Sequence, residues 1–241
     1  MLRRDKPGTA QNVEIGDGDR NQMKKTTAKY EYVLFDLDGT LTDPALGITN
    51  SVMYALKKFG IEETDRTKLY KFIGPPLTES FEKFYGFTKE QSLDGVKYYR
   101  EYYHDKGIYE NRVYDGLEEV LKKINEAGKQ AIVATSKPEE YAKIIIDYFH
   151  LTKYFACVAG MEMDGGRGTK AQVITYALEK NDITDKSKVL MIGDREHDVI
   201  GAHLNGLDCL GILYGFGSRE EFEEAGADYI RENVEDILQF V

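Results

Sequence analysis

The sequence predicts a doubly wound α/β fold, in which helices cover a parallel sheet and one helical subdomain is inserted. Short, almost wholly apolar runs recur along the chain, and stretches with helical spacing separate them. Such runs are typical of strands that helices cover on both faces, and the alternation is typical of a parallel sheet. It is interrupted once, between Asp43 and Asp115, where 115 − 43 = 72 positions show helical patterns and no convincing strand.

Six apolar runs are the predicted strands. They are "EYVLFD" (31–36), "KQAIVAT" (129–135), "FACVAG" (155–160), "KVLMIGD" (188–194), "CLGILYG" (209–215) and "ADYI" (227–230). The predicted helices between them are "YDGLEEVLKKINEAG", "KPEEYAKIIIDYFHL", "KAQVITYALEKN" and "REHDVIGAHLNG". Ligands of such sheets bind beyond the carboxyl ends of the strands, and Asp36, Thr135 and Asp194 each fall at such an end.

The stretch that interrupts the alternation is interpreted as a cap. Because it leaves and rejoins the chain just after the first strand, we expect it to lie over the strand ends as a lid. Its aromatic stripe is expected to be cap core, and consists of Tyr98, Tyr99, Tyr102 and Tyr103. The predicted division is a core of residues 30–43 and 113–241 and a helical cap of residues 44–112.

Residues 1–29 are predicted to be a disordered extension. The first 22 residues are polar, without periodicity and without the apolar region of a signal peptide. The segment that begins at Met23 resembles a natural N-terminus of the protein.

The composition limits the partners of the protein. A net charge of −10 disfavours nucleic acid and anionic membranes as partners, and no apolar run approaches the roughly 18 residues that span a bilayer. Cys157 and Cys209 lie in apolar stretches and are expected to be buried thiols, which suits a cytoplasmic protein. A small anionic substrate remains compatible with this charge, because local groups and a cation dominate a small site.

Carboxylates gather at the predicted strand ends. Asp36 and Asp38 share one side of an extended chain, since side chains alternate with period two. Asp194 ends another strand, and Asp198 follows one helical turn later. Such groups repel one another unless a cation neutralises them. All-oxygen ligation suits Mg²⁺, so the sequence predicts a magnesium site here.

This arrangement predicts phosphoryl chemistry. A carboxylate beside Mg²⁺, Asp36, is expected to attack phosphorus, and Asp38 to act as general acid and base. Thr135 and Ser136, with Pro138 expected at the first helical position, are predicted to bind phosphate at a helix N-terminus. Lys170 is expected to bridge the nucleophile and the phosphate.

Each motif also has a simpler interpretation. The Asp36–Thr40 segment resembles a polar turn, Asp194 and Asp198 resemble helix-capping carboxylates, and Thr135 resembles an ordinary N-cap. A solvated helix lysine is the simpler interpretation of Lys170. Lys137 is a candidate to face the opening of the site, but it is expected to be a surface lysine. The order of the motifs at successive strand ends favours the catalytic interpretation.

The motifs resemble those of the haloacid dehalogenase-like superfamily of phosphohydrolases, over residues 30–241. The first motif of that superfamily, Asp-x-Asp-Gly-Thr-Leu-x-Asp, appears as "DLDGTLTD" (36–43) and is highly specific. The others are weak singly and strong in order, and are Thr135 in "IVATSKP", Lys170, and "GDREHD" (193–198). The cap segment "FIGPPLTESF" (72–81) resembles an active-site loop of the phosphoglycolate phosphatase-like branch, some members of which are called 5′-nucleotidases.

The resemblance implies a Rossmann-like core whose first strand is central. It implies that Asp36 is the nucleophile. It also implies that the metal is bound by the side chains of Asp36 and Asp194 and the backbone carbonyl of Asp38, and that Asp198 acts on the metal through water. It further implies hydrolysis of a small phosphomonoester, with phosphoglycolate or a 5′-nucleotide as the leading substrates. Specificity would come from the cap, where Gly74, Pro75, Arg100 and the tyrosines are candidates.

Four alternatives are weighed against a phosphatase. A phosphomutase shares the motifs but excludes water. A dehalogenase would give Asp38 no acid role, because halide leaves without a proton. A receiver-like signalling module lacks both "DLDGT" and a cap insertion. A catalytically silent binding protein with this fold would retain reactive residues without using them.

Overall fold

The computed structural model describes residues 29–163 and 166–241. The predicted extension, apart from Lys29, lies outside these residues. Within them, no helix has both the length and the apolar character that crossing a membrane requires.

The core is a parallel sheet of six strands in the order β5-β4-β1-β6-β7-β8. The strands are β1 (Tyr32–Phe35), β4 (Gln130–Pro138), β5 (Phe155–Met161), β6 (Val189–Gly193), β7 (Asp208–Ile212) and β8 (Tyr229–Arg231). The chain builds outward from β1 to β5 on one side and then continues with β6 on the other side of β1. The predicted doubly wound α/β sheet is confirmed, with β1 central between β4 and β6.

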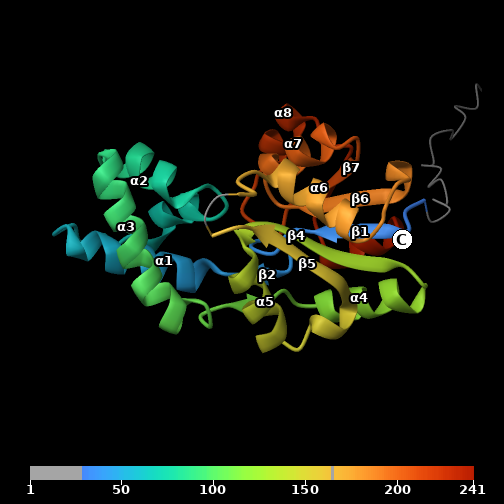
Figure 1. Cartoon of the computed structure of the whole chain (residues 1–241), viewed down its shortest axis with the longest axis horizontal. Coiled ribbons are helices and arrows are strands. Elements are labelled where there is room, and N and C mark those ends of the chain that lie inside the picture. The colour runs from blue at the N-terminus through green and yellow to red at the C-terminus, as the bar shows by residue number, and fades with distance from the viewer. Residues whose placement is uncertain (1–28, 164–165) are drawn as a thin grey trace, which may run out of the picture.

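Helices cover both faces of the sheet (Figure 1). One face carries α4 (Leu117–Glu126) and α5 (Glu139–Tyr148), and the other carries α6 (Lys170–Lys180) and α7 (Glu196–Leu204). Side chains of β1 alternate between them: Val33 and Phe35 belong to one buried apolar cluster and Leu34 to the other. This two-sided burial explains why the first strand is apolar throughout. The remaining elements of the core are η3 (Thr152–Tyr154), η4 (Lys186–Lys188), α8 (Arg219–Ala225) and η5 (Val234–Gln239).

A helical insertion follows the first strand. It leaves the core at β2 (Thr42–Asp43) and returns at β3 (Arg112–Val113), and these two short strands pair antiparallel. Between them lie α1 (Ala45–Lys58), η1 (Arg66–Phe72), α2 (Leu77–Tyr85), α3 (Lys89–Tyr102) and the π-helix η2 (Tyr103–Gly107). Arg112 donates from Nε and Nη2 to Asp43 Oδ2, at 3.0 and 2.9 Å, so an ion pair ties the exit to the return.

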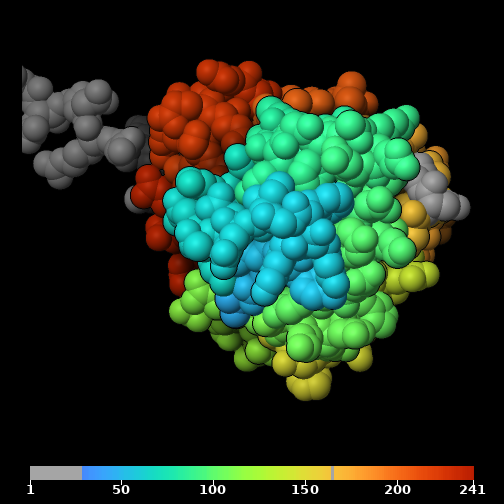
Figure 2. Space-filling model, turned by 90° about the vertical axis from the view of Figure 1, so that its left-hand side faces the viewer, coloured from blue at the N-terminus to red at the C-terminus, as the bar shows by residue number. Residues whose placement is uncertain are grey.

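The insertion covers one end of the core. Its helices lie beyond the end of the sheet in Figure 1, and they occupy the centre of the face shown in Figure 2. Tyr99 and Tyr103 are buried and their rings stack at 5.3 Å, whereas Tyr98 and Tyr102 are half-buried. The prediction that the tyrosine stripe packs inside the insertion is confirmed for Tyr99 and Tyr103.

Two expected boundaries were wrong. Strand β4 continues past Thr135 to Pro138, which is the N-cap of α5 and not its first helical residue. Strand β7 ends at Ile212 and not at Gly215, because the chain then bends around the end of β6. A Cβ on Gly215 would lie 2.4 Å from Asp194 Cβ, so the bend demands glycine there. Both cysteines are buried and free, as expected.

Truncating the central strand should destabilise the whole core. Leu34 is fully buried, so Leu34→Ala should lower the free energy of unfolding by about 2–5 kcal/mol. Urea unfolding measures this change. Leu204→Ala is the matched control, because that leucine is 74% exposed, and an equal loss in both variants would contradict the assigned core.

Candidate active site

The strand order brings three of the predicted site residues to one edge of the sheet. Asp36 directly follows β1, and its N–H donates to Ile192 O of β6 at 2.9 Å. Thr135 lies in the neighbouring strand β4, and Asp194 directly follows β6. Because β1 lies between these two strands, the side chains converge at the point where the winding changes direction.

Three carboxylates form a compact buried group. One oxygen each of Asp36, Asp194 and Asp198 lies within 4.8 Å of the others, and these residues are 8%, 1% and 1% exposed. Burial raises the pKa of Asp194 and of Asp198 above the ordinary range, and repulsion from the neighbouring carboxylates adds to the effect. An all-oxygen group of this charge fits a hard divalent cation.

Lys170 supplies positive charge inside this group. Helix α6 begins at Lys170, after Thr169, whose side chain caps it by accepting from Gln172 N. Lys170 Nζ lies 2.8 Å from Asp36 Oδ1 and 2.7 Å from Asp198 Oδ1. Burial opposes its charge, but the two carboxylates raise its pKa above the ordinary value. Lys170 is therefore a buried cation at the centre of the site and not a solvated helix lysine.

The chain around Asp194 fixes that carboxylate closely. Phe216 N–H donates to Asp194 Oδ2 at 2.9 Å, and Thr40 Oγ1 donates to Asp194 Oδ1 at 3.4 Å. Gly39 has φ +85°, and a Cβ there would lie 2.0 Å from Asp194 Oδ2. Gly215 approaches the same side chain from the loop after β7. This second loop was not predicted from the sequence, although the spacing of glycines in "LYGFGS" is a signal for it.

Asp38 has a different environment from the three grouped carboxylates. Its Oδ2 lies 2.5 Å from Lys137 Nζ, and Lys137 is only 8% exposed. The expectation of a surface lysine was wrong, because β4 continues beyond Thr135 and places residue i+2 on the same face. Burial and the charge of Asp36 raise the pKa of Asp38, and Lys137 opposes that rise.

The predicted phosphate-binding residues lie in the extended end of β4. Thr135 is 1% exposed, and its Oγ1 accepts from Lys137 N at 3.2 Å. Ser136 is half-buried beside it. The first turn of α5 carries Glu139 and Glu140, and acidic side chains there already compensate the positive end of the helix. Phosphate binding by Thr135 and Ser136 at this helix N-terminus stays a prediction.

The insertion contacts the core beside Asp194. Arg195, the next residue, donates from Nη1 to Ile73 O of the insertion at 2.9 Å and from Nε to Glu221 Oε1 at 2.8 Å. A Cβ on Gly74 would lie 3.5 Å from the same guanidinium. Gly74 thus lies at the contact between insertion and core, whereas Arg100 is exposed on α3.

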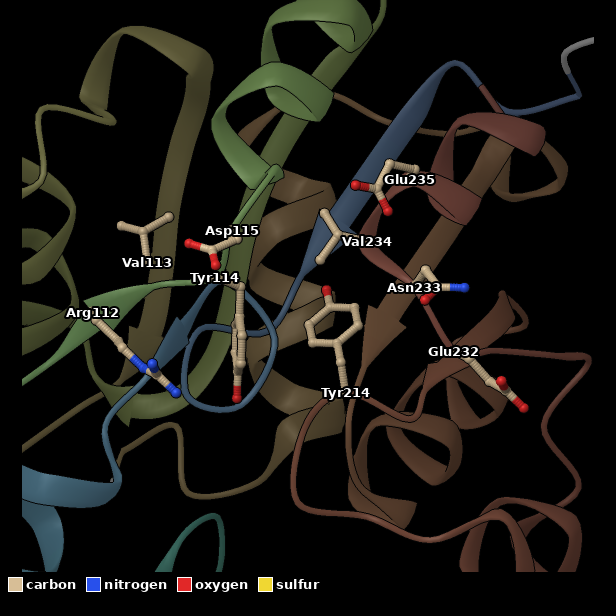
Figure 3. A pocket seen from close by; sticks show the side chains of 9 residues that line it. All are labelled: Arg112, Val113, Tyr114, Asp115, Tyr214, Glu232, Asn233, Val234 and Glu235. Carbon is tan, nitrogen blue, oxygen red and sulfur yellow. The ribbon is translucent and has the colours of Figure 1, made fainter.

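A cavity of about 270 Å³ opens elsewhere, near the return of the insertion (Figure 3). Its lining residues are Arg112, Val113, Tyr114, Asp115, Tyr214, Glu232, Asn233, Val234 and Glu235. It contacts the site only indirectly, because Tyr214 OH donates to Thr40 O at 3.0 Å. The grouped carboxylates and lysines, and not the lining of this cavity, are the candidate reactive groups among the described residues.

A family model described as haloacid dehalogenase-like hydrolase matches residues 33–212. The chain belongs to this family. The match contains Asp36, Asp38, Thr135, Lys170 and Asp194, so the resemblance predicted from the motifs is confirmed at the level of the family.

Three relatives extend the comparison. The chain is 44% identical to a 5′-nucleotidase of Pseudomonas aeruginosa, over 83% of this chain and 90% of that protein. It is 32% identical to the tyrosine-protein kinase PtkA of Mycobacterium tuberculosis, over 83% of this chain and 68% of that protein. A crystal structure of a predicted phosphatase from Clostridium acetobutylicum superposes with a TM-score of 0.82 at 50% identity, covering 87% of this chain and 96% of that chain. Together with the family, the likenesses to the 5′-nucleotidase and to the predicted phosphatase identify the chain as a phosphoric monoester hydrolase.

Removing the central lysine should destabilise the fold in a pH-dependent way. Without metal, Lys170→Met should lower the free energy of unfolding by about 3–5 kcal/mol at pH 8, since it leaves buried carboxylates unpaired. A carboxyl whose pKa is raised in the folded state stabilises the fold at low pH. This stabilisation is lost as the pH rises from the ordinary aspartate pKa, about 4, through the raised pKa of the folded state. The deficit should therefore shrink at pH 5.

Urea unfolding in a chelating buffer at both pH values measures this effect. Lys143→Met is the matched control, because Lys143 is exposed and pairs with Glu139 at the surface. A deficit of equal size at both pH values would contradict the assigned role of Lys170 in neutralising the carboxylates.

Proposed function

We propose that the protein is a Mg²⁺-dependent phosphatase that hydrolyses a small phosphomonoester through an aspartyl-phosphate intermediate on Asp36. One observation carries the proposal: Asp36 and Asp38 lie two residues apart but pair with two different buried lysines, Lys170 and Lys137. Two carboxyl groups whose surroundings differ, and so push their pKa values apart, take different roles in catalysis. Asp36, beside the other carboxylates and a cation, is the nucleophile, and Asp38 is the acid and base.

Two balanced steps follow from these roles. An Asp36 oxygen forms a bond to phosphorus, the bond from phosphorus to the ester oxygen breaks, and Asp38 gives its proton to that oxygen. In the second step Asp38 takes a proton from water, whose oxygen bonds to phosphorus as the bond to Asp36 breaks. Inorganic phosphate leaves, and both carboxyls return to their starting states.

The remaining groups bind the phosphoryl oxygens and the metal. Thr135 and Ser136 would donate to the phosphoryl oxygens, and Lys170 would balance charge beside Asp36. When bound, Mg²⁺ supplies charge stabilisation to the phosphoryl oxygens. It would be held by the side chains of Asp36 and Asp194 and the carbonyl oxygen of Asp38.

Asp198 is proposed to act on the metal indirectly. One of its oxygens lies beside Lys170 and the other accepts from Arg195 N at 3.1 Å. Asp198 would therefore orient Lys170 and reach the metal through water.

The proposed substrates are small phosphorylated metabolites, with phosphoglycolate and nucleoside 5′-monophosphates as the two leading classes. The name of the P. aeruginosa relative supports the second class. A relative from Vibrio parahaemolyticus, 22% identical over 90% of this chain, is named phosphoglycolate phosphatase. A cytoplasmic location is part of the same proposal, because such metabolites and free thiols belong to that compartment.

A second candidate is transfer of the phosphoryl group to an acceptor other than water. The likeness to PtkA favours it, since a hydroxyl that replaced water in the second step would give a kinase or a mutase. The ratio of inorganic phosphate to phosphorylated acceptor, measured with a hydroxyl-bearing acceptor in excess, separates the two candidates.

Replacing the nucleophile should abolish turnover and leave the fold intact. Asp36→Asn keeps the shape of the side chain but removes its nucleophilic charge, so phosphate release should fall by at least about 10³-fold. The assay is release of inorganic phosphate from p-nitrophenyl phosphate and from the proposed substrates, with circular dichroism to verify folding. Asp94→Asn, at an exposed position of α3, is the control. Retained activity in Asp36→Asn would refute the mechanism.

Replacing Asp194 should weaken metal binding. Asp194→Asn removes one of the proposed carboxylate ligands, so the Mg²⁺ concentration for half-maximal activity should rise by about tenfold or more. In the parent protein, Mg²⁺ should also raise the unfolding temperature, and this shift should be lost in the variant. An unchanged Mg²⁺ requirement would remove Asp194 from the ligand set.

A further inference from the structure

A second buried lysine lies on the side of Asp38 that faces the insertion. The side chain of Lys137 is 6% exposed. Its Nζ lies 2.5 Å from Asp38 Oδ2 and 5.0 Å from the centre of the Tyr103 ring. The grouped carboxylates already have Lys170 as their cation. Lys137 is therefore a second buried lysine of the site, held beside Asp38 at the boundary between the core and the insertion.

Tyr103 adds a buried hydroxyl to the same place. This residue of the insertion is 2% exposed, and its hydroxyl has no hydrogen-bond partner among the described residues. Its ring stacks on Tyr99 at 5.3 Å and meets Tyr141 edge-on at 5.6 Å, so packing fixes its position. Buried hydroxyls without a partner are rare because they are costly, and an unpaired one beside a reactive site points to a ligand.

The proposed reaction places the leaving group against these two residues. Asp38 gives its proton to the ester oxygen, so that oxygen must come within about 2.6–3.2 Å of the Asp38 carboxyl. Lys137 touches the same carboxyl, and Tyr103 packs beneath Lys137. Atoms one or two bonds beyond the ester oxygen therefore enter the space beside an ammonium group and a phenol.

Both groups are hydrogen-bond donors, and one of them is charged. A neutral, apolar group at this point would leave the Tyr103 hydroxyl without a partner, which is costly, and would give Lys137 no acceptor besides Asp38. A carboxylate or a second phosphoryl group would accept from both. The rings of Tyr99 and Tyr141 pack against Tyr103, and this close packing favours a compact leaving group.

We propose that Lys137 and Tyr103 form a subsite for a second anionic group on the substrate. The preferred substrates are then compact phosphomonoesters in which an anion lies one or two bonds beyond the ester oxygen, and not esters with a neutral group there, such as nucleoside 5′-monophosphates. This inference rests on the proposed function and chooses between its two substrate classes.

A matched pair of substrates tests the subsite. Phosphoglycolate and 2-hydroxyethyl phosphate have the same length, but the first ends in a carboxylate and the second in a neutral alcohol. The experiment measures kcat and KM for both substrates in the Mg²⁺-loaded full-length protein and in Lys137→Met, Tyr103→Phe and Lys143→Met. The ratio of the two kcat/KM values cancels any general loss of activity or of folded protein.

The parent protein should prefer phosphoglycolate. Lys137→Met should reduce that preference by about tenfold or more, the usual effect of losing a hydrogen bond from a charged group. Tyr103→Phe should also reduce the preference, by a smaller factor. Because this variant keeps the packed ring, it tests the subsite even if Lys137→Met does not fold. Lys143→Met, at the exposed lysine of α5, should leave the preference unchanged.

Two outcomes would overturn the subsite alone. Equal losses on both substrates in Lys137→Met and an unchanged ratio in Tyr103→Phe would mean that Lys137 acts only through Asp38. A parent protein that hydrolyses both substrates without preference would exclude anion recognition there, and the proposed phosphatase mechanism would still stand. Failure of the parent protein to release phosphate from any phosphomonoester, including p-nitrophenyl phosphate, would instead overturn the proposed function together with the subsite.

Discussion

The ion pairs of Lys170 with Asp36 and Asp198 are the interaction on which the rest of the site depends. Carboxylates buried this close together repel one another, and burial alone already disfavours their charge. The single ammonium group between two of them allows the chain to fold with the group in place. It offsets only part of the negative charge, and this remaining charge supports the proposed binding of a divalent cation. The stability of the folded site and its proposed reactivity therefore depend on the same buried charges.

The sheet order makes this interaction possible. Strand β1 lies between β4 and β6, so a carboxylate that follows β1 has neighbours from both sides. Helix α6 packs on the face opposite α4 and α5 and begins where its first residue, Lys170, reaches the strand ends. The insertion leaves the core at β2 and returns at β3, and its residues Ile73 and Tyr103 contact Arg195 and Lys137 beside the grouped carboxylates.

Much of the fold and part of the site follow from patterns that a sequence displays directly. Apolar runs separated by helical spacing predict the parallel sheet, and polar residues at the ends of such runs predict Asp36, Thr135 and Asp194 as neighbours. Lys170 is predicted by its place at the start of a helix and by the family pattern. Each of these signals is local in the chain. Because the strands of a parallel sheet end at the same edge, residues at the ends of neighbouring strands lie close together.

The parts that were missed depend on contacts between distant segments. Lys137 reads as a surface lysine because nothing local shows that β4 continues past Thr135 or that the insertion covers it. Gly39 and Gly215 come from separate loops, and only their shared approach to Asp194 explains why neither position accommodates a side chain. The unpaired hydroxyl of Tyr103 likewise emerges only from packing, since a buried aromatic stripe predicts the core of the insertion and not a donor beside Asp38.

The most direct test of the central claim is to trap the intermediate. The protein would be mixed with Mg²⁺ and a hydrolysed phosphomonoester, quenched with acid during steady-state turnover, digested, and examined by mass spectrometry. The account predicts one added phosphoryl group on the peptide that contains Asp36, lost when Mg²⁺ is chelated before mixing and absent from Asp36→Asn. A phosphoryl group on a different residue, or none during active turnover under conditions that preserve acyl phosphates, would contradict Asp36 as the nucleophile.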